Sequence, residues 1–169
     1  MKTALTALLI LFLGIQSQAH MKNKEQLFQI HKAVLKSINS DGVSYGVYKR
    51  TQKNFIGDLD FHNPDGLDTS ASNIWKKPQW KAFLNRIDTA TLANYPLSTN
   101  DKSWFKSIRK SKRAVVFAPV MVSDDGTMAL SIMMFHNQLG QPASSRVYFL
   151  EKEEGKWVIK QDRMLVLID

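Results

Sequence analysis

The sequence predicts an α+β fold, with N-terminal helices packed on one face of a four- to five-stranded antiparallel meander sheet. Two observations carry this prediction. Apolar residues recur at helical spacing before residue 113, and four short runs rich in β-branched and aromatic residues follow it. The connections between those runs are shorter than the roughly dozen residues that a parallel crossover needs, so neighbouring strands must be antiparallel.

The first nineteen residues form a separate leader. Met1-Lys2 is a short positive segment, residues 4–15 are almost entirely apolar, and Gln16-Ser17-Gln18-Ala19 ends in a small-x-small pattern. This is the pattern of a secretory signal peptide, and its apolar run is shorter than the roughly twenty residues that span a bilayer. We therefore expect cleavage after Ala19, export to the periplasm or the medium, and a single domain over residues 20–169. An uncleaved anchor is the alternative.

Composition limits the chemistry. The 169 residues include no cysteine, which excludes disulfides, thiolate metal sites, iron–sulfur clusters, cysteine nucleophiles and a lipoprotein anchor. The formal net charge of +8 is compatible with nucleic acid, acidic polysaccharide or an anionic membrane surface as a partner. Because the basic residues are spread along the chain, a lysine-rich exterior is the favoured interpretation.

Helices are predicted at residues 23–39, 70–88 and 101–110. The first has the clearest stripe, made by Leu27, Ile30, His31, Val34, Leu35 and Ile38. His31 lies within that stripe, so we interpret it as a core histidine in preference to a pocket base. The second helix has Pro78 in its first turn, where a missing N–H costs nothing. Residues 42–51 alternate in polarity and predict either a short strand at the sheet edge or an extended connection.

The four predicted strands are Ala114–Val122, Thr127–His136, Ser145–Lys152 and Lys156–Ile168. Asp125-Gly126 lies between apolar runs and predicts a tight hairpin turn, because glycine accepts the positive φ that such a turn needs. Glu153-Glu154-Gly155 predicts a second turn of the chain. The second strand is apolar on both faces, so we expect it to be central and covered on both sides. The apolar phase of the last strand changes near Gln161, which predicts a bulge.

The loop 58–68 concentrates polar donors in a segment that Pro64 and Gly66 keep non-helical; the donors are Asp58, Asp60, His62, Asp65 and Asp68. Oxygen-rich loops of this kind bind divalent cations, although the EF-hand spacing is not met. Asp60 with His62 is also a possible acid–base pair. A solvated turn-rich loop is the favoured interpretation, and no metal site is predicted.

Basic side chains are concentrated at 102–113, among Trp104 and Phe105; they are Lys102, Lys106, Arg109, Lys110, Lys112 and Arg113. Basic residues interleaved with aromatic ones are typical of binders of nucleic acid or polysaccharide. A solvated helix face is the favoured interpretation. No groove-reading helix motif, RNP sequence or zinc finger accompanies the patch.

No local catalytic motif is present: the sequence lacks a glycine-rich phosphate loop, a G-x-S-x-G elbow, H-E-x-x-H and S-x-x-K. No cofactor is predicted. Catalysis would require residues that meet only in the fold, in a pocket between helices and sheet. The candidates for such a pocket are His136, Arg146, Tyr148 and Trp157, which end or line adjacent predicted strands, with His62 as a further one.

Segments 112–120, 123–130 and 151–159 together resemble small exported bacterial proteins of uncharacterised function. In those proteins an extended segment, an Asp-Gly turn, an Ala-Leu strand and a final Gly-Lys-Trp hairpin follow a helical half. The terminal hairpin is also similar to that of nuclear-transport-factor-2-like (cystatin-like) cone domains. The resemblance covers about the last third of the chain, consists of structural residues and implies no catalytic ones.

Three functions follow as hypotheses. The first is a non-enzymatic binding or interaction domain, suggested by a well-patterned scaffold without a catalytic signature. The second is a small cofactor-independent hydrolase or isomerase that uses the pocket residues named above. The third is a binder of anionic polymers in the cell envelope, through Lys106, Arg109, Lys110, Lys112 and Arg113, with Trp157 as a further candidate ligand contact.

Overall fold

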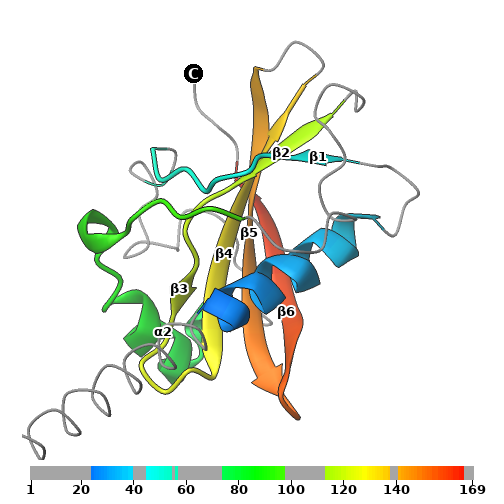
Figure 1. The fold of residues 1–169 in the computed structure, drawn as a ribbon. Coiled ribbons are helices and arrows are strands. Elements are labelled where there is room, and N and C mark those ends of the chain that lie inside the picture. The colour runs from blue at the N-terminus through cyan, green and yellow to red at the C-terminus, as the bar shows by residue number, and fades with distance from the viewer. Residues whose placement is uncertain are drawn as a thin grey trace, which may run out of the picture.

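The chain folds around a six-stranded mixed sheet with helices on both of its faces (Figure 1). This arrangement is seen in a computed structural model, which describes residues 24–39, 45–54, 56, 74–97, 113–137 and 141–165. The α+β class predicted from the sequence is confirmed. The signal peptide, the loop 58–68 and basic residues 102–112 lie outside the described residues.

The strands, in chain order, are β1 (Gly46–Val47), β2 (Ala114–Phe117), β3 (Met121–Val122), β4 (Met128–His136), β5 (Pro142–Glu153) and β6 (Lys156–Leu165). Their order across the sheet is β1-β2-β4-β5-β6, and β3 also pairs with β4. All pairs are antiparallel except β1 with β2. The expected edge strand in residues 42–51 therefore forms, but it runs parallel to its neighbour and makes the sheet mixed.

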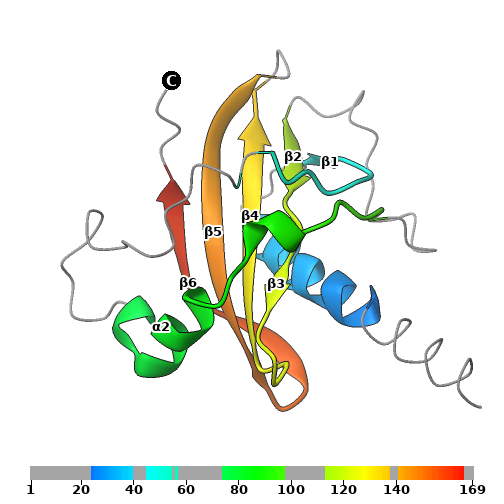
Figure 2. The same cartoon turned by 90° about the vertical axis from the view of Figure 1, so that its left-hand side faces the viewer.

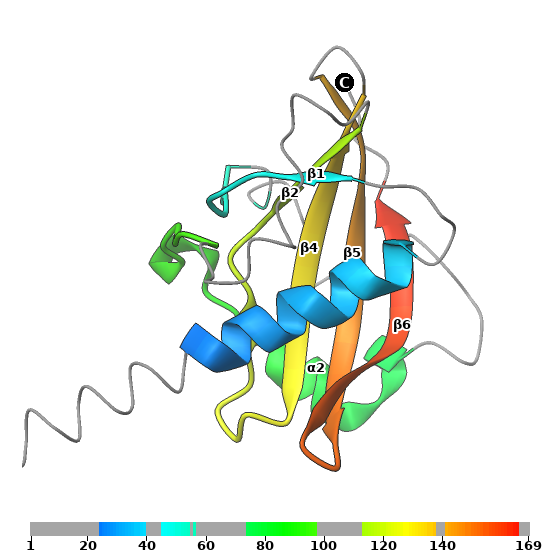
Figure 3. The same ribbon diagram turned by 45° about the vertical axis from the view of Figure 1, so that its right-hand side comes forward.

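The predicted placement of the helices on one face of a simple meander is wrong. The N-terminal helix, residues 24–38, crosses one face of the sheet, while α2 (Pro78–Leu84) and the 3-10 turn η3 (Ile74–Lys76) lie on the other (Figures 2 and 3). An amphipathic stripe shows that a helix covers a surface but carries no information about which face. We call the side under residues 24–38 the inner face and the other side the outer face.

Each face has its own apolar layer. Val34 of the N-terminal helix packs in the inner layer with Ala129 and Met133 of β4, while Trp80 of α2 packs in the outer layer with Leu130 and Ile132. Successive residues of β4 thus point alternately to the two layers, as strand geometry requires. The prediction of a central strand covered on both sides is confirmed.

The first predicted strand, residues 114–122, is interrupted. Both β2 and β3 pair with β4, with partners Phe117↔Met133 and Met121↔Leu130, so three residues on one side face two on the other. Pro119 lies in this break. Proline has no N–H for the ladder, which explains why one apolar run becomes two short strands.

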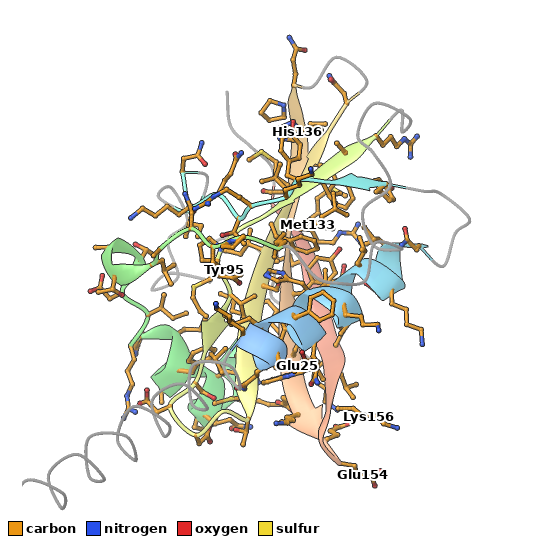
Figure 4. The ribbon with its side chains drawn as sticks, in the orientation of Figure 1. Glu25, Tyr95, Met133, His136, Glu154 and Lys156 are labelled. Carbon is orange, nitrogen blue, oxygen red and sulfur yellow. The ribbon has the colours of Figure 1, made fainter. Side chains whose placement is uncertain are left out.

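Both predicted turns are confirmed. Gly126 has φ +70° and donates its N–H to Ser123 O at 2.8 Å. Glu154 and Gly155 have φ of 48° and 80°, so both central residues adopt the left-handed conformation of a two-residue hairpin loop. Figure 4 shows Glu154 and Lys156 at this hairpin, at the opposite end of the sheet from His136.

β5 starts earlier than predicted, and the bulge predicted in the last strand is present. β5 begins at Pro142, three residues before the predicted start, and Asn137 N donates to Gln141 O at 2.9 Å where the preceding loop closes. The register between β5 and β6 shifts between Phe149 and Leu150, opposite Gln161 and Ile159. This is the bulge that the phase change near Gln161 predicts.

No helix within the described residues has the length and apolarity needed to cross a membrane.

Candidate ligand-binding cleft

A cleft of about 670 Å³ opens on the inner face, beside the C-terminal end of the N-terminal helix. Ser37 and Ile38 border it from that helix, and Tyr45 borders it from the segment before β1. Three strands supply the remaining wall; the principal side chains are Phe135, Ser144, Arg146, Tyr148, Asp162 and Met164. The volume lies within the range of roughly 300–1,000 Å³ typical of small-molecule sites.

The strand register brings the polar residues of the cleft together. Tyr148 in β5 is paired with Ser131 in β4 and with Asp162 in β6. Arg146 lies two residues before Tyr148 and therefore projects from the same face. Residues that are opposite each other in antiparallel strands also share a face, so polar side chains from three strands lie in one row on the inner face.

Arg146 and Asp162 form an ion pair that joins β5 to β6. Arg146 Nη1 lies 3.0 Å from Asp162 Oδ2, and the two side chains are 33% and 42% exposed. Arg146 Nε is buried and has no hydrogen-bond partner among the described residues. Because a guanidinium offers five N–H donors in a fixed fork, this ion pair leaves further donor capacity beside the cleft.

Tyr148 is almost fully buried, and no hydrogen bond of acceptable geometry reaches its hydroxyl from the described residues. Burial raises the pKa of Tyr148 well above its ordinary value, because the phenolate would lose its hydration; the nearby positive charge of Arg146 opposes this shift. Tyr148 therefore remains a neutral phenol at physiological pH. It can donate one hydrogen bond and accept others, and it cannot act as a base.

The inner layer holds other polar atoms without partners among the described residues. They are Ser131 Oγ, opposite Tyr148, Trp157 Nε1 and His31 Nδ1. A buried polar group that lacks its hydrogen bond typically costs about 1–3 kcal/mol, so such groups are rare without a reason. These atoms all lie in the inner layer, between the N-terminal helix and the inner face of the sheet.

Apolar side chains form another part of the cleft wall. The Tyr45 ring meets the Phe135 ring edge-on, with centroids 5.6 Å apart and planes at 68°. Ile38 and Ile159 are partly buried beside them. Met164, on the rim, is 55% exposed and is the large apolar side chain that β6 leaves in solvent. Aromatic and aliphatic walls with a few polar groups are typical of sites for small organic molecules.

The structure brings together several of the residues predicted from the sequence. His136, Arg146 and Tyr148 all line the cleft, as does Arg113, the last residue of the predicted basic patch. The His136 ring itself lies against the Tyr48 ring, with centroids 5.4 Å apart, and Figure 4 shows it at one end of β4.

Trp157 does not line the cleft; it packs in the inner apolar layer, because its place near the β5–β6 turn is far along the strands from Arg146. The remaining predicted residues, His62, Lys106, Arg109, Lys110 and Lys112, lie outside the described residues.

Sequence reasoning missed Tyr45 and Asp162, which line the cleft, and Ser131, which is paired with Tyr148 without lining it. Tyr45 reaches the cleft only because β1 pairs in parallel with β2, which is a long-range event without a local signal. Asp162 comes after the bulge in β6, where the inward phase of the strand has shifted. Ser131 is a polar residue on a strand face that is otherwise apolar, and this break in the apolar pattern is the sequence signal for it.

His31 is a core histidine, as the sequence predicts. It is 1% exposed, and its Nε2 lies 2.8 Å from the Tyr95 hydroxyl, which in turn accepts the Val120 N–H at 3.1 Å. Burial lowers the pKa of His31 to about 3, so the ring is neutral at physiological pH. Within the described residues, no three His, Asp or Glu side chains gather as metal ligands would.

A second, smaller depression of about 460 Å³ lies on the other side of the molecule, between α2 and the turn that follows β3. Its polar edge includes an ion pair between Arg86 Nη1 and Asp124 Oδ2 at 3.1 Å. Both side chains are largely exposed, so solvent screens this pair and it contributes little to stability.

Comparison of the chain with protein-family models, with curated proteins and with solved structures gave no match.

Proposed function

We propose that the protein is an exported, non-enzymatic binding domain and that it holds a small organic molecule in the inner-face cleft. The observation that carries the proposal is the Tyr148 hydroxyl, buried and without a hydrogen-bond partner among the described residues, on the wall of a cleft of about 670 Å³. A bound ligand would supply the missing hydrogen bond.

The composition of the cleft supports this proposal. Tyr45 and Phe135 offer an aromatic wall, and Arg146 and Tyr148 offer hydrogen-bond donors close to it. A ligand seated there would bury apolar surface and satisfy polar groups together, which is how small-molecule sites combine affinity with specificity.

The groups in the cleft favour binding over catalysis. Tyr148 stays protonated, and Asp162, the carboxylate among the described lining residues, is held by Arg146. Neither is placed to take a proton from a substrate, as a general base must. The fold likewise contains no activated nucleophile among these residues.

A hydrolase or isomerase activity is the second candidate, because His136 and Tyr148 border the same cleft. His136 would act as the base and Tyr148 as the proton donor. A screen against ester, amide and keto–enol substrates tests this function: turnover that disappears in His136→Ala would replace the binding proposal with the catalytic one.

Export, the similarity to nuclear-transport-factor-2-like cone domains, and polymer binding by residues 102–113 remain proposals. Sequencing the mature N-terminus tests export, with His20 expected as the first residue. Polymer binding predicts retention on heparin that falls steeply with salt, because such contacts release counterions.

Titration of ¹⁵N-labelled protein with a library of small organic fragments tests the main proposal. We expect the fragments that bind to shift the amide resonances of Tyr45, Phe135 and Tyr148. Ile159→Trp narrows the cleft and should weaken the affinity of these fragments at least tenfold. Ala82→Trp, in the depression beside α2, is the matched control. Fragments that shift only the residues around α2, or a library without any binder, would refute the proposal.

A further inference from the structure

We infer that the ligand of the cleft is a small organic carboxylate, with an apolar or aromatic body, whose carboxylate is bound by Arg146 and Tyr148. The inference rests on the proposed function and adds the chemical class of the ligand. Three observations lead to it: the charge of the cleft, the unused donors that flank it, and an internal carboxylate that already occupies part of the guanidinium.

The described side chains that border the cleft favour an anion. Arg113 and Arg146 carry positive charge and Asp162 carries negative charge; Asp162 pairs with Arg146, and Arg113 has an interaction of its own. Arg113 is exposed at the rim, while Arg146 is partly buried between β4 and β6. A partly buried guanidinium is screened less by salt than an exposed one, so it attracts an anion more strongly.

The unused hydrogen-bonding atoms are donors suited to a carboxylate. Arg146 Nε carries one N–H and Tyr148 Oη carries one O–H, and neither atom makes a hydrogen bond of acceptable geometry within the described residues, although the Arg146 side chain lies beside the Tyr148 hydroxyl. A carboxylate has two oxygens and no proton, so it can accept from both at once. A ligand ammonium group has no acceptor, so it can donate to the Tyr148 oxygen but leaves the Arg146 N–H unsatisfied.

Asp162 shows where a carboxylate binds in this part of the sheet. Its Oδ2 lies 3.0 Å from Arg146 Nη1, within the distance of a charge-assisted hydrogen bond. The contact with Asp162 involves Nη1, so the remaining donors of the guanidinium are the ones that we assign to a ligand carboxylate. Asp162 nevertheless weakens that ligand, since it neutralises part of the Arg146 charge. Asp162 is thus an internal competitor, and its removal should tighten binding.

The apolar side chains of the cleft indicate that the part of the ligand beyond its carboxylate is apolar. Tyr45 and Phe135 lie on the β4 side of Arg146 and Tyr148, and Ile159 and Met164 flank Asp162 along β6. A phenyl or short alkyl group attached to the carboxylate would fill this space. Its burial would lower the free energy of binding roughly in proportion to the apolar area removed from water.

Isothermal titration with three probes of the same shape tests the inference: 3-phenylpropanoate, 3-phenylpropanamide and 3-phenylpropylamine. We expect the carboxylate to bind at least tenfold more tightly than the amide, and the amine most weakly. Arg146→Gln should weaken the carboxylate at least tenfold and the amide much less, because only the carboxylate loses a charge-assisted hydrogen bond. Asp162→Asn should tighten the carboxylate severalfold, an effect that mere loss of folding cannot produce.

Arg86→Gln is the matched control, because Arg86 makes a similar ion pair with Asp124 outside the cleft; it should change none of the three affinities. Binding of the amide or the amine as tightly as the carboxylate would overturn the ligand class and leave the cleft as a binding site. If other fragments bind in the cleft while none of the three probes binds, the ligand class is likewise wrong and the cleft remains a binding site. Absence of any ligand from the cleft would overturn the proposed function as well.

Discussion

His31 Nε2 lies 2.8 Å from the hydroxyl of Tyr95, and the His31 ring packs on Phe117 with centroids 4.5 Å apart. The ring contact with Phe117 joins the N-terminal helix to strand β2 of the sheet. It places a titratable ring inside the inner layer, where a charge would be costly.

The first prediction is that acid destabilises the fold through His31. Its pKa is about 3 in the folded protein and about 6.5 when the ring is solvated, so between these values the unfolded state binds the extra proton. The His31 contribution is therefore complete above pH 6.5 and is lost as the pH falls toward 3, at up to about 1.4 kcal/mol per pH unit.

Urea unfolding at pH 7.5, 5.5 and 4.5 measures this effect. His31→Phe keeps an aromatic ring against Phe117 and removes the titration, so its stability should fall less steeply between pH 7.5 and 4.5 than that of the wild type. Equal slopes for the two proteins would show that carboxylates, and not His31, control the acid response.

The second prediction concerns the Tyr95 hydroxyl, which shares a hydrogen bond with His31 Nε2 and accepts a hydrogen bond from the Val120 N–H. Tyr95→Phe removes both bonds and leaves two buried groups unpaired. We expect the free energy of unfolding to fall by about 1–3 kcal/mol. Tyr48→Phe is the control, because no hydrogen bond to the Tyr48 hydroxyl is found within the described residues. Similar losses in both variants, measured by urea unfolding, would contradict this account.

The third prediction compares two buried tryptophans. Trp80 Nε1 donates to Glu151 Oε1 at 2.8 Å and joins α2 to β5, whereas Trp157 Nε1 has no partner among the described residues. Replacement by Phe removes the same volume from each, but only Trp80→Phe breaks a hydrogen bond. Trp80→Phe should cost about 1 kcal/mol more than Trp157→Phe. Thermal or urea unfolding measures the difference, and a larger loss for Trp157→Phe would refute the assignment.

The fourth prediction concerns the turn between β5 and β6. Gly155 has φ +80°, and nothing lies within 4 Å of the position that a Cβ would take. Gly155→Ala therefore introduces backbone strain without a clash, and should cost about 1–2 kcal/mol. Gly155→Asn should cost less, because asparagine tolerates this conformation better. Equal losses in urea unfolding would indicate that backbone strain is not the cause.

The sequence predicts the elements whose signals are local. The alternation in 128–136 and the glycines of the two hairpin turns indicate β4, β5, β6 and their antiparallel pairing, because turn chemistry and strand period act over a few residues. Pro119 was visible as well, and its missing N–H accounts for the break between β2 and β3.

The sequence does not predict how distant segments meet. The parallel pairing of Gly46 with Ala114 and the placement of α2 on the outer face depend on long-range packing. The cleft was predicted only in part for the same reason. His136, Arg146 and Tyr148 share adjacent strands and could be grouped by their spacing, whereas Tyr45 comes from another edge of the sheet and Asp162 follows a bulge.

The most direct test of the account is a crystal structure of the protein grown with a saturating concentration of 3-phenylpropanoate. We predict electron density in the inner-face cleft, with the carboxylate within hydrogen-bond distance of Arg146 and Tyr148 and the phenyl ring against Tyr45 or Phe135. Density for the probe beside α2, or an unoccupied cleft in crystals that contain saturating probe, would contradict the central claim.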